Sequence, residues 1–445
     1  MYLKTNSFLV IGLKKSGFSI SKLLLERGAK VYIYDDNVSE VVSKNIKELT
    51  TFGGIFVDNP IEILNLIDVL VLSPAVPIDN EIALLARKLQ KRIVGELELA
   101  SYFINSPVVA VTGTNGKTTV SSIISHVLKC ANVNNVLVGN VGTPLSSKVS
   151  EIDENTVCVT EVSSYQLETV NRFCPHIAVI LNVTPDHLER HYNMSNYLYL
   201  KGKILLNLKE SEYAVLNYDD ENVLNFTEKT KAKILWFSVK EKVNGAYLKD
   251  GFLNYDNQPI ISVNELNILG IHNVENCLAS ICALKLLGID NLIIKEGLKS
   301  FVGVKHRIQP IKTVNGVTFY NDSKSTNPDA TVKAINTVKE STVLILGGYE
   351  KGFSYNELMK EIKKSNNVIG VVITGMSAKT MYDSAISNGV ENVSVISDFI
   401  LAVKYAYGLA SSGDAVLLSP ATSSFDNFSD FEERGDKFIE IVSSL

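Results

Sequence analysis

A glycine-containing loop, Thr112–Thr119, is the feature that most constrains what this chain can fold into. It reads Thr-Gly-Thr-Asn-Gly-Lys-Thr-Thr, follows an apolar stretch and precedes a helix-like segment. Glycines in such a loop let backbone N–H groups turn toward phosphate oxygens, and the N-terminus of the following helix adds a favourable dipole. Val111 stands where a general phosphate-binding loop has its first glycine. The strand–loop–helix order still indicates a nucleotide-binding parallel α/β sheet.

The rest of the chain repeats this order. Apolar, β-branched runs alternate with helix-like segments, as in parallel sheets covered by helices, and 445 residues are too many for one ordinary domain. We expect an α/β protein of three domains: a Rossmann-like N-terminal domain (1–95), a central P-loop ATPase-like domain with a parallel sheet (96–303) and a C-terminal Rossmann-like domain (304–445). The short polar stretch 240–268 predicts an antiparallel flap. The clearest strands are expected at 7–11, 30–34, 68–72, 108–112, 156–160, 176–181, 213–216, 318–320, 342–346, 368–373 and 415–418.

Composition excludes several classes of protein. A net charge of −5 argues against a chain built to neutralise nucleic-acid phosphates. No stretch approaches the roughly 18 apolar residues of a membrane-spanning helix, and the apolar run 8–11 is too short for a signal peptide. The five cysteines lack metal-ligand spacing, which predicts buried free thiols in a reducing compartment. We expect a cytoplasmic monomer with no nucleic-acid partner and no membrane insertion.

A nucleotide-binding loop also needs a cation for the phosphates and oxygen ligands for a metal ion. Lys117 supplies a cation for the β- and γ-phosphates, and the Thr118 hydroxyl can ligate Mg²⁺. Downstream, the apolar strand at 156–160 leads directly to Glu161. A cation bound to a triphosphate prefers oxygen ligands, so a carboxylate at this strand end predicts a metal ligand.

Together these residues resemble the Mur ligase family, the ATP-dependent ligases of peptidoglycan and folate metabolism. The loop at 112–118 is the most specific element of the resemblance, which spans essentially the whole chain. Further segments occur in the family's order: 161–167, 182–190, 270–273, 304–307 and 321–328. Lys14 stands where relatives usually carry a second glycine, and Glu189 where Asp is more usual.

Two segments favour one member of the family. The C-terminal stretch 418–435 and the N-terminal turn 12–17 resemble the enzyme that adds D-glutamate to UDP-N-acetylmuramoyl-L-alanine. A sister ligase that uses another amino acid, such as the L-alanine-adding enzyme or folylpolyglutamate synthetase, is the nearest alternative. A nicotinamide-dependent oxidoreductase built on the N-terminal fold, and a P-loop ATPase or binding module without ligase activity, are the alternatives of other classes.

The resemblance implies a reaction through an acyl phosphate, with ATP, two Mg²⁺ ions and an N-carbamoylated lysine at Lys201. Its implied catalytic residues are Lys117, Glu161, His187 and Lys201, and its metal ligands are Thr118, Glu161, His187 and Lys201. Its implied ATP-binding residues are Gly113, Thr114, Asn115, Gly116, Lys117, Thr118, Thr119, Asn273, His306, Arg307 and Asp322. Residues implied to bind the UDP-sugar are Leu13, Lys15, Ser16, Gly17, Asp35, Ser73 and Asn140. The alternative for 12–17 is a tight turn that binds no ligand. Residues implied to bind D-glutamate are Lys324, Thr326, Lys351, Ser424, Phe425 and Phe431, of which the phenylalanines can equally be core.

Overall fold

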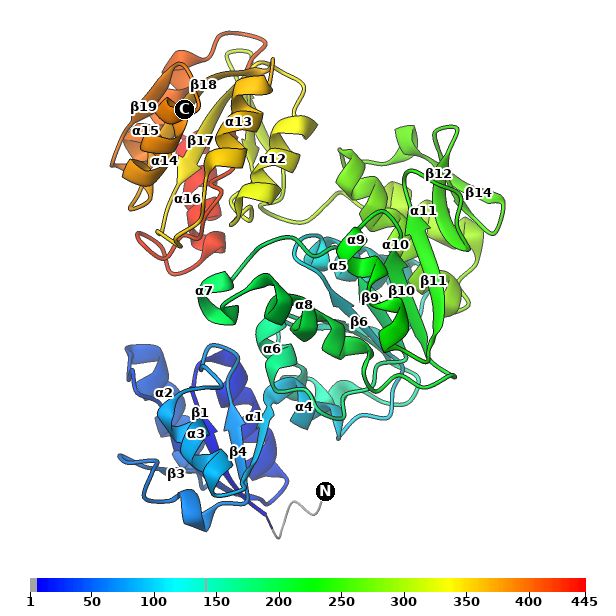
Figure 1. The fold of residues 1–445 in the computed structure, drawn as a ribbon, viewed down its shortest axis with the longest axis vertical. Coiled ribbons are helices and arrows are strands. Elements are labelled where there is room, and N and C mark those ends of the chain that lie inside the picture. The colour runs from blue at the N-terminus through cyan, green and yellow to red at the C-terminus, as the bar shows by residue number, and fades with distance from the viewer. Residues whose placement is uncertain (1–5, 141) are drawn as a thin grey trace. The chain divides into compact units, whose positions relative to one another are not determined.

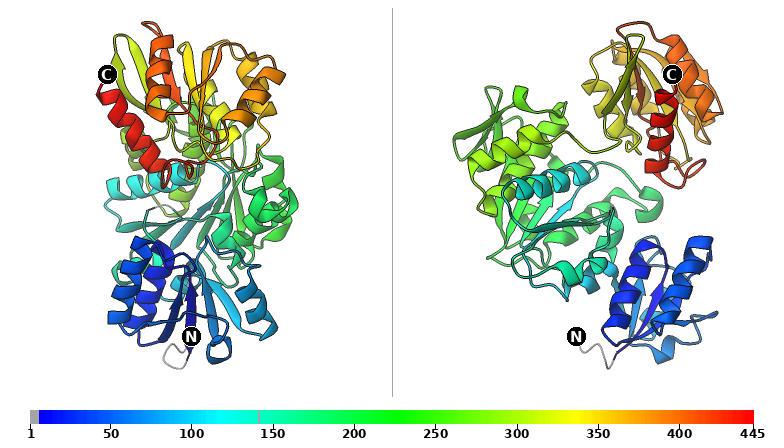
Figure 2. Two further views of the ribbon diagram at one scale, coloured as in Figure 1. Left: turned by 90° about the vertical axis from the view of Figure 1, so that its left-hand side faces the viewer. Right: turned by 180° about the vertical axis from the view of Figure 1, so that it is seen from behind.

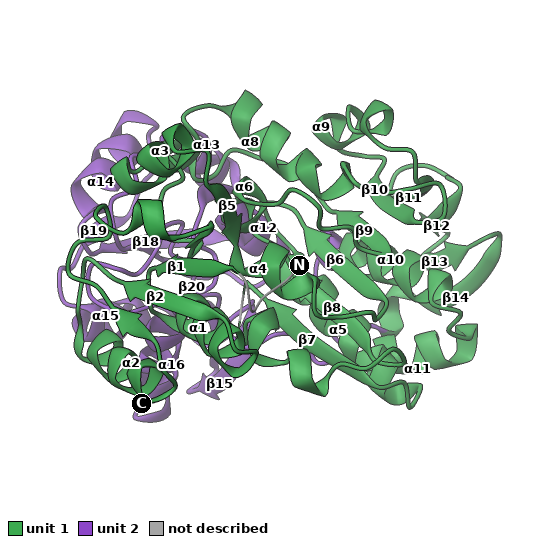
Figure 3. Ribbon diagram, turned by 90° about the horizontal axis from the view of Figure 1, so that it is seen from below, with its two compact units in different colours: residues 1–265, 274–300 green, residues 266–273, 301–445 purple. Residues whose placement is uncertain are grey.

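Parallel-rich sheets covered by helices make up the protein (Figure 1). The structure is a computed structural model that describes residues 6–140 and 142–445. The chain divides into two compact units, of which one runs to Glu265 and includes Val274–Ser300, and the other comprises Leu266–Asn273 and Phe301–Leu445 (Figure 3). The first unit holds two sheets and the second holds one.

The N-terminal sheet has five parallel strands in the order β3-β2-β1-β4-β5. Its strands are β1 (Ser7–Ile11), β2 (Lys30–Tyr34), β3 (Ile55–Phe56), β4 (Val69–Leu72) and β5 (Arg92–Gly95). Its helices are α1 (Lys15–Glu26), α2 (Glu40–Thr51) and α3 (Glu81–Lys88). Apolar side chains of α1 and α2 pack on one face of the sheet, and those of α3 pack on the other. Because β1 lies between β2 and β4, the loop after β1 opens at the edge where such folds bind ligands.

The central sheet has nine strands in the order β14-β13-β12-β11-β10-β9-β6-β8-β7. They are β6 (Val108–Thr112), β7 (Asn135–Gly139), β8 (Val157–Glu161), β9 (Ile177–Ile180), β10 (Tyr213–Asn217), β11 (Lys233–Ser238), β12 (Gly245–Lys249), β13 (Phe252–Tyr255) and β14 (Gln258–Ser262). Its helices are α4 (Glu96–Ser101), α5 (Lys117–Cys130), α6 (Ser164–Glu168), α7 (Leu188–His191), α8 (Met194–Gly202), α9 (Glu221–Leu224), α10 (Ile271–Leu286) and α11 (Asn291–Ser300). The expected antiparallel pairing occurs at β12, β13 and β14, but these strands extend the main sheet because β12 pairs in parallel with β11.

The C-terminal sheet has six strands in the order β15-β16-β20-β17-β18-β19, with an antiparallel hairpin at β15 and β16 and parallel pairing elsewhere. The strands are β15 (Gln309–Val314), β16 (Val317–Asn321), β17 (Thr342–Gly347), β18 (Val368–Thr374), β19 (Val393–Val395) and β20 (Ala415–Leu418). The helices are α12 (Pro328–Thr337), α13 (Asn356–Lys364), α14 (Ala378–Ser387), α15 (Phe399–Leu409) and α16 (Phe431–Ser443). Helices α12 to α14 cover one face and α15 and α16 the other, a layering that Figure 2 shows from two further sides.

Two expectations from composition can be compared with the structure. Within residues 6–140 and 142–445, no helix is both long and apolar enough to cross a membrane. The prediction that all the cysteine thiols are buried was wrong for Cys130, which is exposed at the last residue of α5, and Cys174 is only half-buried. Cys158, Cys277 and Cys282 are buried as expected.

Candidate active site

The loop between β6 and α5 has the backbone geometry of a phosphate-binding loop. Gly113 and Gly116 have φ angles of +150° and +91°, which residues with a Cβ atom rarely adopt. A Cβ at Gly116 would also collide with the side-chain oxygen of Asn276. Asn182 fixes the loop from the neighbouring segment, since it accepts from the N–H of Asn115 (2.9 Å) and donates to the carbonyl of Asn115 (3.1 Å). The conformation of the loop is therefore fixed in part by residues that lie outside the loop.

Two lysines meet at the carbonyl of Gly113. Lys117 Nζ donates to the carbonyls of Gly113 (2.9 Å) and Thr114 (2.8 Å), and Lys201 Nζ, from α8, donates to Gly113 (2.7 Å). The side chain of Lys201 is buried, with 1% of its surface exposed. Burial, and secondly the positive charge of Lys117, hold the pKa of Lys201 well below its usual value. The structure therefore favours a neutral Lys201 amine beside the phosphate loop.

Glu161 connects the loop to a second strand end. Its Oε2 accepts from the Thr118 hydroxyl (2.7 Å), and its Oε1 accepts from the Asn140 amide (2.9 Å). The carboxylate is buried at the carboxyl end of β8, the strand beside β6. A hydroxyl and a carboxylate are the oxygen ligands that Mg²⁺ prefers, so Thr118 and Glu161 fit one metal ion. Asn140 was predicted to contact the UDP-sugar, and the structure places it on the phosphate-loop carboxylate.

His187 lies on a strained turn near the same loop. Its φ is +53°, its N–H donates to Asp186 Oδ1 (2.9 Å), and its Nδ1 is 2.9 Å from the Tyr165 hydroxyl. Asp186 is buried and its charge acts on Lys201, so it belongs to the site although sequence reasoning did not select it. Its signal was its place beside His187 in the motif. No cluster of three or more His, Cys, Asp and Glu side chains suited to a metal occurs among the described residues, so a second ion would need an additional anionic ligand.

A cavity of about 450 Å³ opens at the carboxyl ends of β1, β2 and β4. Its lining residues are Ile11, Gly12, Lys14, Tyr34, Asp35, Asp36, Asn37, Ser73, Ala75, Val76, Pro77, Asn80, Glu81 and Ile82. Asp35 and Ser73 were predicted here, and each also supports the turn: Asp35 Oδ2 accepts from Leu13 N (2.6 Å) and Ser73 Oγ donates to the Gly12 carbonyl (2.6 Å).

Five of the seven residues predicted to bind the UDP-sugar do not line this cavity: Leu13, Lys15, Ser16, Gly17 and Asn140. Leu13 is fully buried in the core. Lys14 lines the cavity instead, at the position where relatives usually have a glycine. The departure from the family pattern was visible in the sequence, but which way the side chain points was not.

Gly17 is required for close packing. A Cβ there would collide with the Gly12 carbonyl oxygen and lie 2.7 Å from Ser73 Oγ. We expect Gly17→Ala to lower the free energy of unfolding of the first unit by about 2 kcal/mol, as overpacking does, and to weaken UDP binding. Urea unfolding and calorimetric titration with UDP measure the two effects. Gly408→Ala, in an open position on α15, is the matched control; equal behaviour of the two variants would contradict the packing role.

The second unit gathers polar residues at the carboxyl ends of β16, β17 and β20. Asp322 is buried, accepts from the Ser419 hydroxyl (2.7 Å) and from Ile308 N (3.1 Å), and has a pKa raised by its burial. His306, predicted to bind ATP, is also buried: its Nδ1 is 3.0 Å from the Asn321 amide, and a Cβ at Gly435 would collide with its ring. In this unit His306 holds the strand end in place.

The residues predicted to bind D-glutamate are spread over three loops of this unit. Lys324 Nζ lies 4.3 Å from the centre of the Phe431 ring, and Lys351 Nζ lies 4.5 Å from that of Phe353. Thr326 is half-buried and Ser424 buried, whereas Phe425 is 65% exposed and so is not core.

Sequence reasoning missed Arg434, which connects two of these loops. Its buried guanidinium donates to Ser323 Oγ (3.0 Å) and to the Thr422 carbonyl (3.1 Å), and burial lowers its pKa to about 9. Two other predicted residues bind within the unit: Asn273 donates to the Leu269 carbonyl (2.7 Å), and Arg307 lies 3.5 Å from Ser325 Oγ.

Comparison with known proteins agrees with this geometry. Residues 111–284 match the Mur ligase middle domain, and residues 306–422 match the glutamate ligase domain of Mur ligases. The UDP-N-acetylmuramoylalanine–D-glutamate ligase of Thermoanaerobacter sp. is 42% identical over 100% of both chains. The chain belongs to the Mur ligase family. The enzyme of the same name from Clostridioides difficile is 37% identical, again over 100% of both chains.

Solved structures of Mur ligases have the same fold. The UDP-N-acetylmuramate–alanine ligase of Thermotoga maritima matches with a TM-score of 0.64 and 22% identity over 99% of both chains. The MurF ligase of Thermotoga maritima, solved in complex with ADP, matches with a TM-score of 0.63 and 17% identity over 100% of this chain and 99% of its own. At these identities the match establishes the α/β Mur ligase fold and no more.

Proposed function

We propose that this Mur ligase joins D-glutamate to UDP-N-acetylmuramoyl-L-alanine and converts ATP to ADP and phosphate, in the synthesis of peptidoglycan precursors. The full-length relatives carry the name of this activity. The structural observation that carries the proposal is the meeting of Lys117, Lys201 and the Thr118–Glu161 pair at one phosphate loop. An oxidoreductase has no use for that cluster, and the curated relatives compared above are ligases.

The reaction needs two transfers. A carboxylate oxygen of the muramoyl-alanine attacks the γ-phosphorus of ATP, the bond to the ADP oxygen breaks, and an acyl phosphate forms. The amine nitrogen of D-glutamate then attacks the acyl carbon, the bond to the phosphate oxygen breaks, and the amine loses a proton. Negative charge accumulates on the reacting groups in both transfers. The main tasks of the chain are therefore to position the reactants and to supply positive charge.

The described residues have distinct parts in these tasks. Backbone N–H groups of residues 113–119 and the N-terminus of α5 bind phosphate oxygens, and Lys117 turns from the carbonyls of Gly113 and Thr114 to reach them. Thr118 and Glu161 would hold one Mg²⁺, which would neutralise charge on the phosphates. His187 and an N-carbamoylated Lys201 would hold a second ion, because carbamoylation would convert the buried amine into an anionic oxygen ligand.

The remaining assignments follow the three sheets. We place the UDP-sugar in the cavity of residues 1–95 on Asp35 and Ser73, ATP and chemistry in residues 96–303, and D-glutamate in residues 304–445. In that last part Lys324, Thr326, Lys351 and Ser424 would bind the two carboxylates, with Phe425 and Phe431 beside them. The ATP contacts of Asn273, His306, Arg307 and Asp322, and a monomeric, cytoplasmic enzyme, stay predictions.

Phosphate release tests the function directly. With ATP, Mg²⁺ and UDP-N-acetylmuramoyl-L-alanine present, we expect release when D-glutamate is added, and none when the nucleotide sugar is omitted. L-alanine, L-glutamate and L-lysine serve as controls. Release with one of these in place of D-glutamate would keep the family and overturn the substrate, and release without any amino acid would favour a plain ATPase.

A further inference from the structure

The segment that begins at His187 also reaches the rim of the UDP-sugar cavity. Arg190, in α7, donates from Nη2 to the Val76 carbonyl (2.9 Å) and from Nη1 to the Ala75 carbonyl (3.3 Å). Ala75 and Val76 line the cavity. Two residues further on, the Tyr192 hydroxyl donates to Asp79, which follows the cavity-lining residues 75–77 in the same loop. One short segment of the central sheet therefore contacts the N-terminal cavity loop at both Arg190 and Tyr192.

The other edge of the Arg190 guanidinium is fixed by Glu168. Arg190 Nε donates to Glu168 Oε1 (3.0 Å) and Nη2 donates to Oε2 (2.6 Å), the paired geometry that gives an arginine one orientation. The Glu168 side chain is only 3% exposed, so this ion pair is shielded from water. His191 Nδ1 lies 3.4 Å from Glu168 Oε1, and burial lowers the pKa of His191 to about 4, so of these two partners of the carboxylate Arg190 is the charged one at near-neutral pH.

Arg190 is also connected to the ring of His187. Its guanidinium lies 5.2 Å from the centre of the Tyr165 ring, and the Tyr165 hydroxyl is 2.9 Å from His187 Nδ1. The segment has positive φ angles at both ends, +53° at His187 and +67° at Tyr192. Such conformations in non-glycine residues persist only when surrounding contacts hold them. The contacts of Arg190 and Tyr192 are among those that hold this segment, together with those of His187 to Asp186 and Tyr165.

We infer that Arg190 is a positioning residue that couples the loop at 75–79 of the UDP-sugar cavity to the placement of His187. Arg190 contacts the cavity rim through the Val76 and Ala75 carbonyls. Through Glu168 and Tyr165 it holds the position of the His187 ring. Binding of the nucleotide sugar then favours the His187 position used for metal binding. Metal binding in turn favours binding of the nucleotide sugar, because coupling between two sites is reciprocal. The inference rests on the function proposed above.

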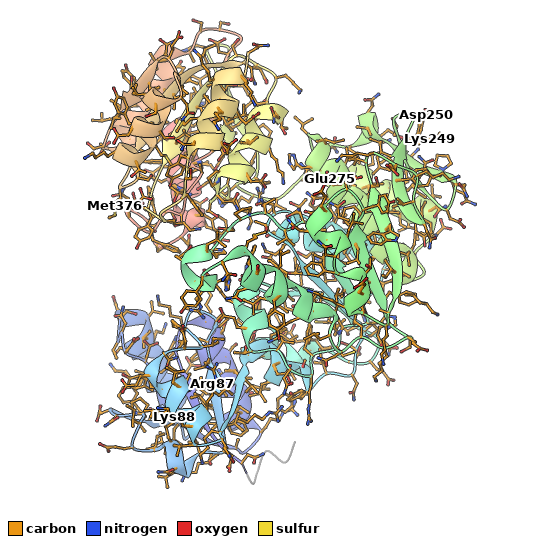
Figure 4. All side chains as sticks on the ribbon, in the orientation of Figure 1. Arg87, Lys88, Lys249, Asp250, Glu275 and Met376 are labelled. Atoms are coloured by element: carbon orange, nitrogen blue, oxygen red, sulfur yellow. The ribbon has the colours of Figure 1, made fainter. Side chains whose placement is uncertain are left out.

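Arg190→Met tests this coupling, since methionine keeps much of the length and removes every donor. Calorimetric titration gives the Kd for UDP-N-acetylmuramoyl-L-alanine, and phosphate release gives the Mg²⁺ concentration for half-maximal rate. We expect both to rise about 10-fold, with the KM for D-glutamate unchanged, as a coupling of ordinary size predicts. Lys88→Met, at an exposed residue of α3 (Figure 4), is the control and should change neither value.

A purely structural role predicts a different result. A lower melting temperature with an unchanged Kd and an unchanged Mg²⁺ requirement would overturn the inference, as would weaker sugar binding alone. If Arg190→Met does not fold, Tyr192→Phe removes only the exposed contact to Asp79 and should shift both values the same way, by about 3-fold; no shift in either value would overturn the inference. Failure of the wild-type protein to release phosphate with D-glutamate would instead count against the proposed function, because the Kd measurement needs no turnover.

Discussion

Replacing Lys201 with alanine should remove nearly all ligase activity, and short-chain carboxylates should restore part of it. The side chain is 1% exposed, and its amine lies 2.7 Å from the Gly113 carbonyl of the phosphate loop. Burial and the neighbouring Lys117 hold its pKa well below the usual value, which raises the fraction of neutral amine that can form a bond to CO₂. The resulting carbamate is an anion in a place where the described residues alone provide no three-ligand metal cluster.

The rescue distinguishes a carbamate from a plain lysine. Loss of an electrostatic group at a transition state lowers kcat by about 10²- to 10³-fold, and we expect at least this for Lys201→Ala. Acetate or formate should raise the rate of the variant in a saturable way, because either can enter the space left by the side chain and supply carboxylate oxygens. Lys209→Ala, at an exposed lysine beyond the same helix, is the control and should keep full activity. Absence of rescue at any carboxylate concentration would count against the carbamate.

Most interior strands of the fold could be predicted from the sequence, and most edge strands could not. The expected strands at 7–11, 30–34, 108–112 and 415–418 have those bounds in the structure. These strands lie inside parallel sheets, so both faces are buried and the sequence is apolar throughout. The structure adds the edge strands β3, β5, β7, β15 and β19 and the interior strand β11. An edge strand is defined by pairing with one neighbour more than by its own pattern.

The site residues also divide into those that could be predicted from the sequence and those that could not. The phosphate loop and Glu161 could be found because each is local: a run of particular residues next to a strand. Arg190 and Arg434 act through partners more than 80 residues away, such as the Val76 carbonyl and Ser323 Oγ, and no local pattern encodes those contacts. The same limit explains the UDP-sugar turn, where Gly17 matches the family pattern but serves packing, and Lys14 departs from it but lines the cavity.

Replacing Lys117 with methionine should also lower kcat by about 10³-fold, but through two effects rather than one. The first is loss of the cation that would meet the β- and γ-phosphates at the start of α5. The second acts on Lys201: the charge of Lys117 is the second-largest cause that lowers the pKa of Lys201, after burial. Without that charge the pKa of Lys201 rises, less of its amine is neutral at a given pH, and less carbamate can form.

The two effects predict a dependence on pH and CO₂ that loss of a phosphate contact alone would not give. For the Lys117→Met variant, the residual rate should increase with bicarbonate and with pH to a greater extent than the wild-type rate, because both favour carbamate formation at Lys201. Lys117→Arg keeps the charge and should lose activity without the added dependence, and Lys129→Met, at the far end of α5, should behave as wild type. Phosphate release across bicarbonate concentrations measures all four proteins. Equal bicarbonate responses in Lys117→Met and wild type would show that Lys117 acts on the phosphates alone, and that burial by itself keeps Lys201 neutral.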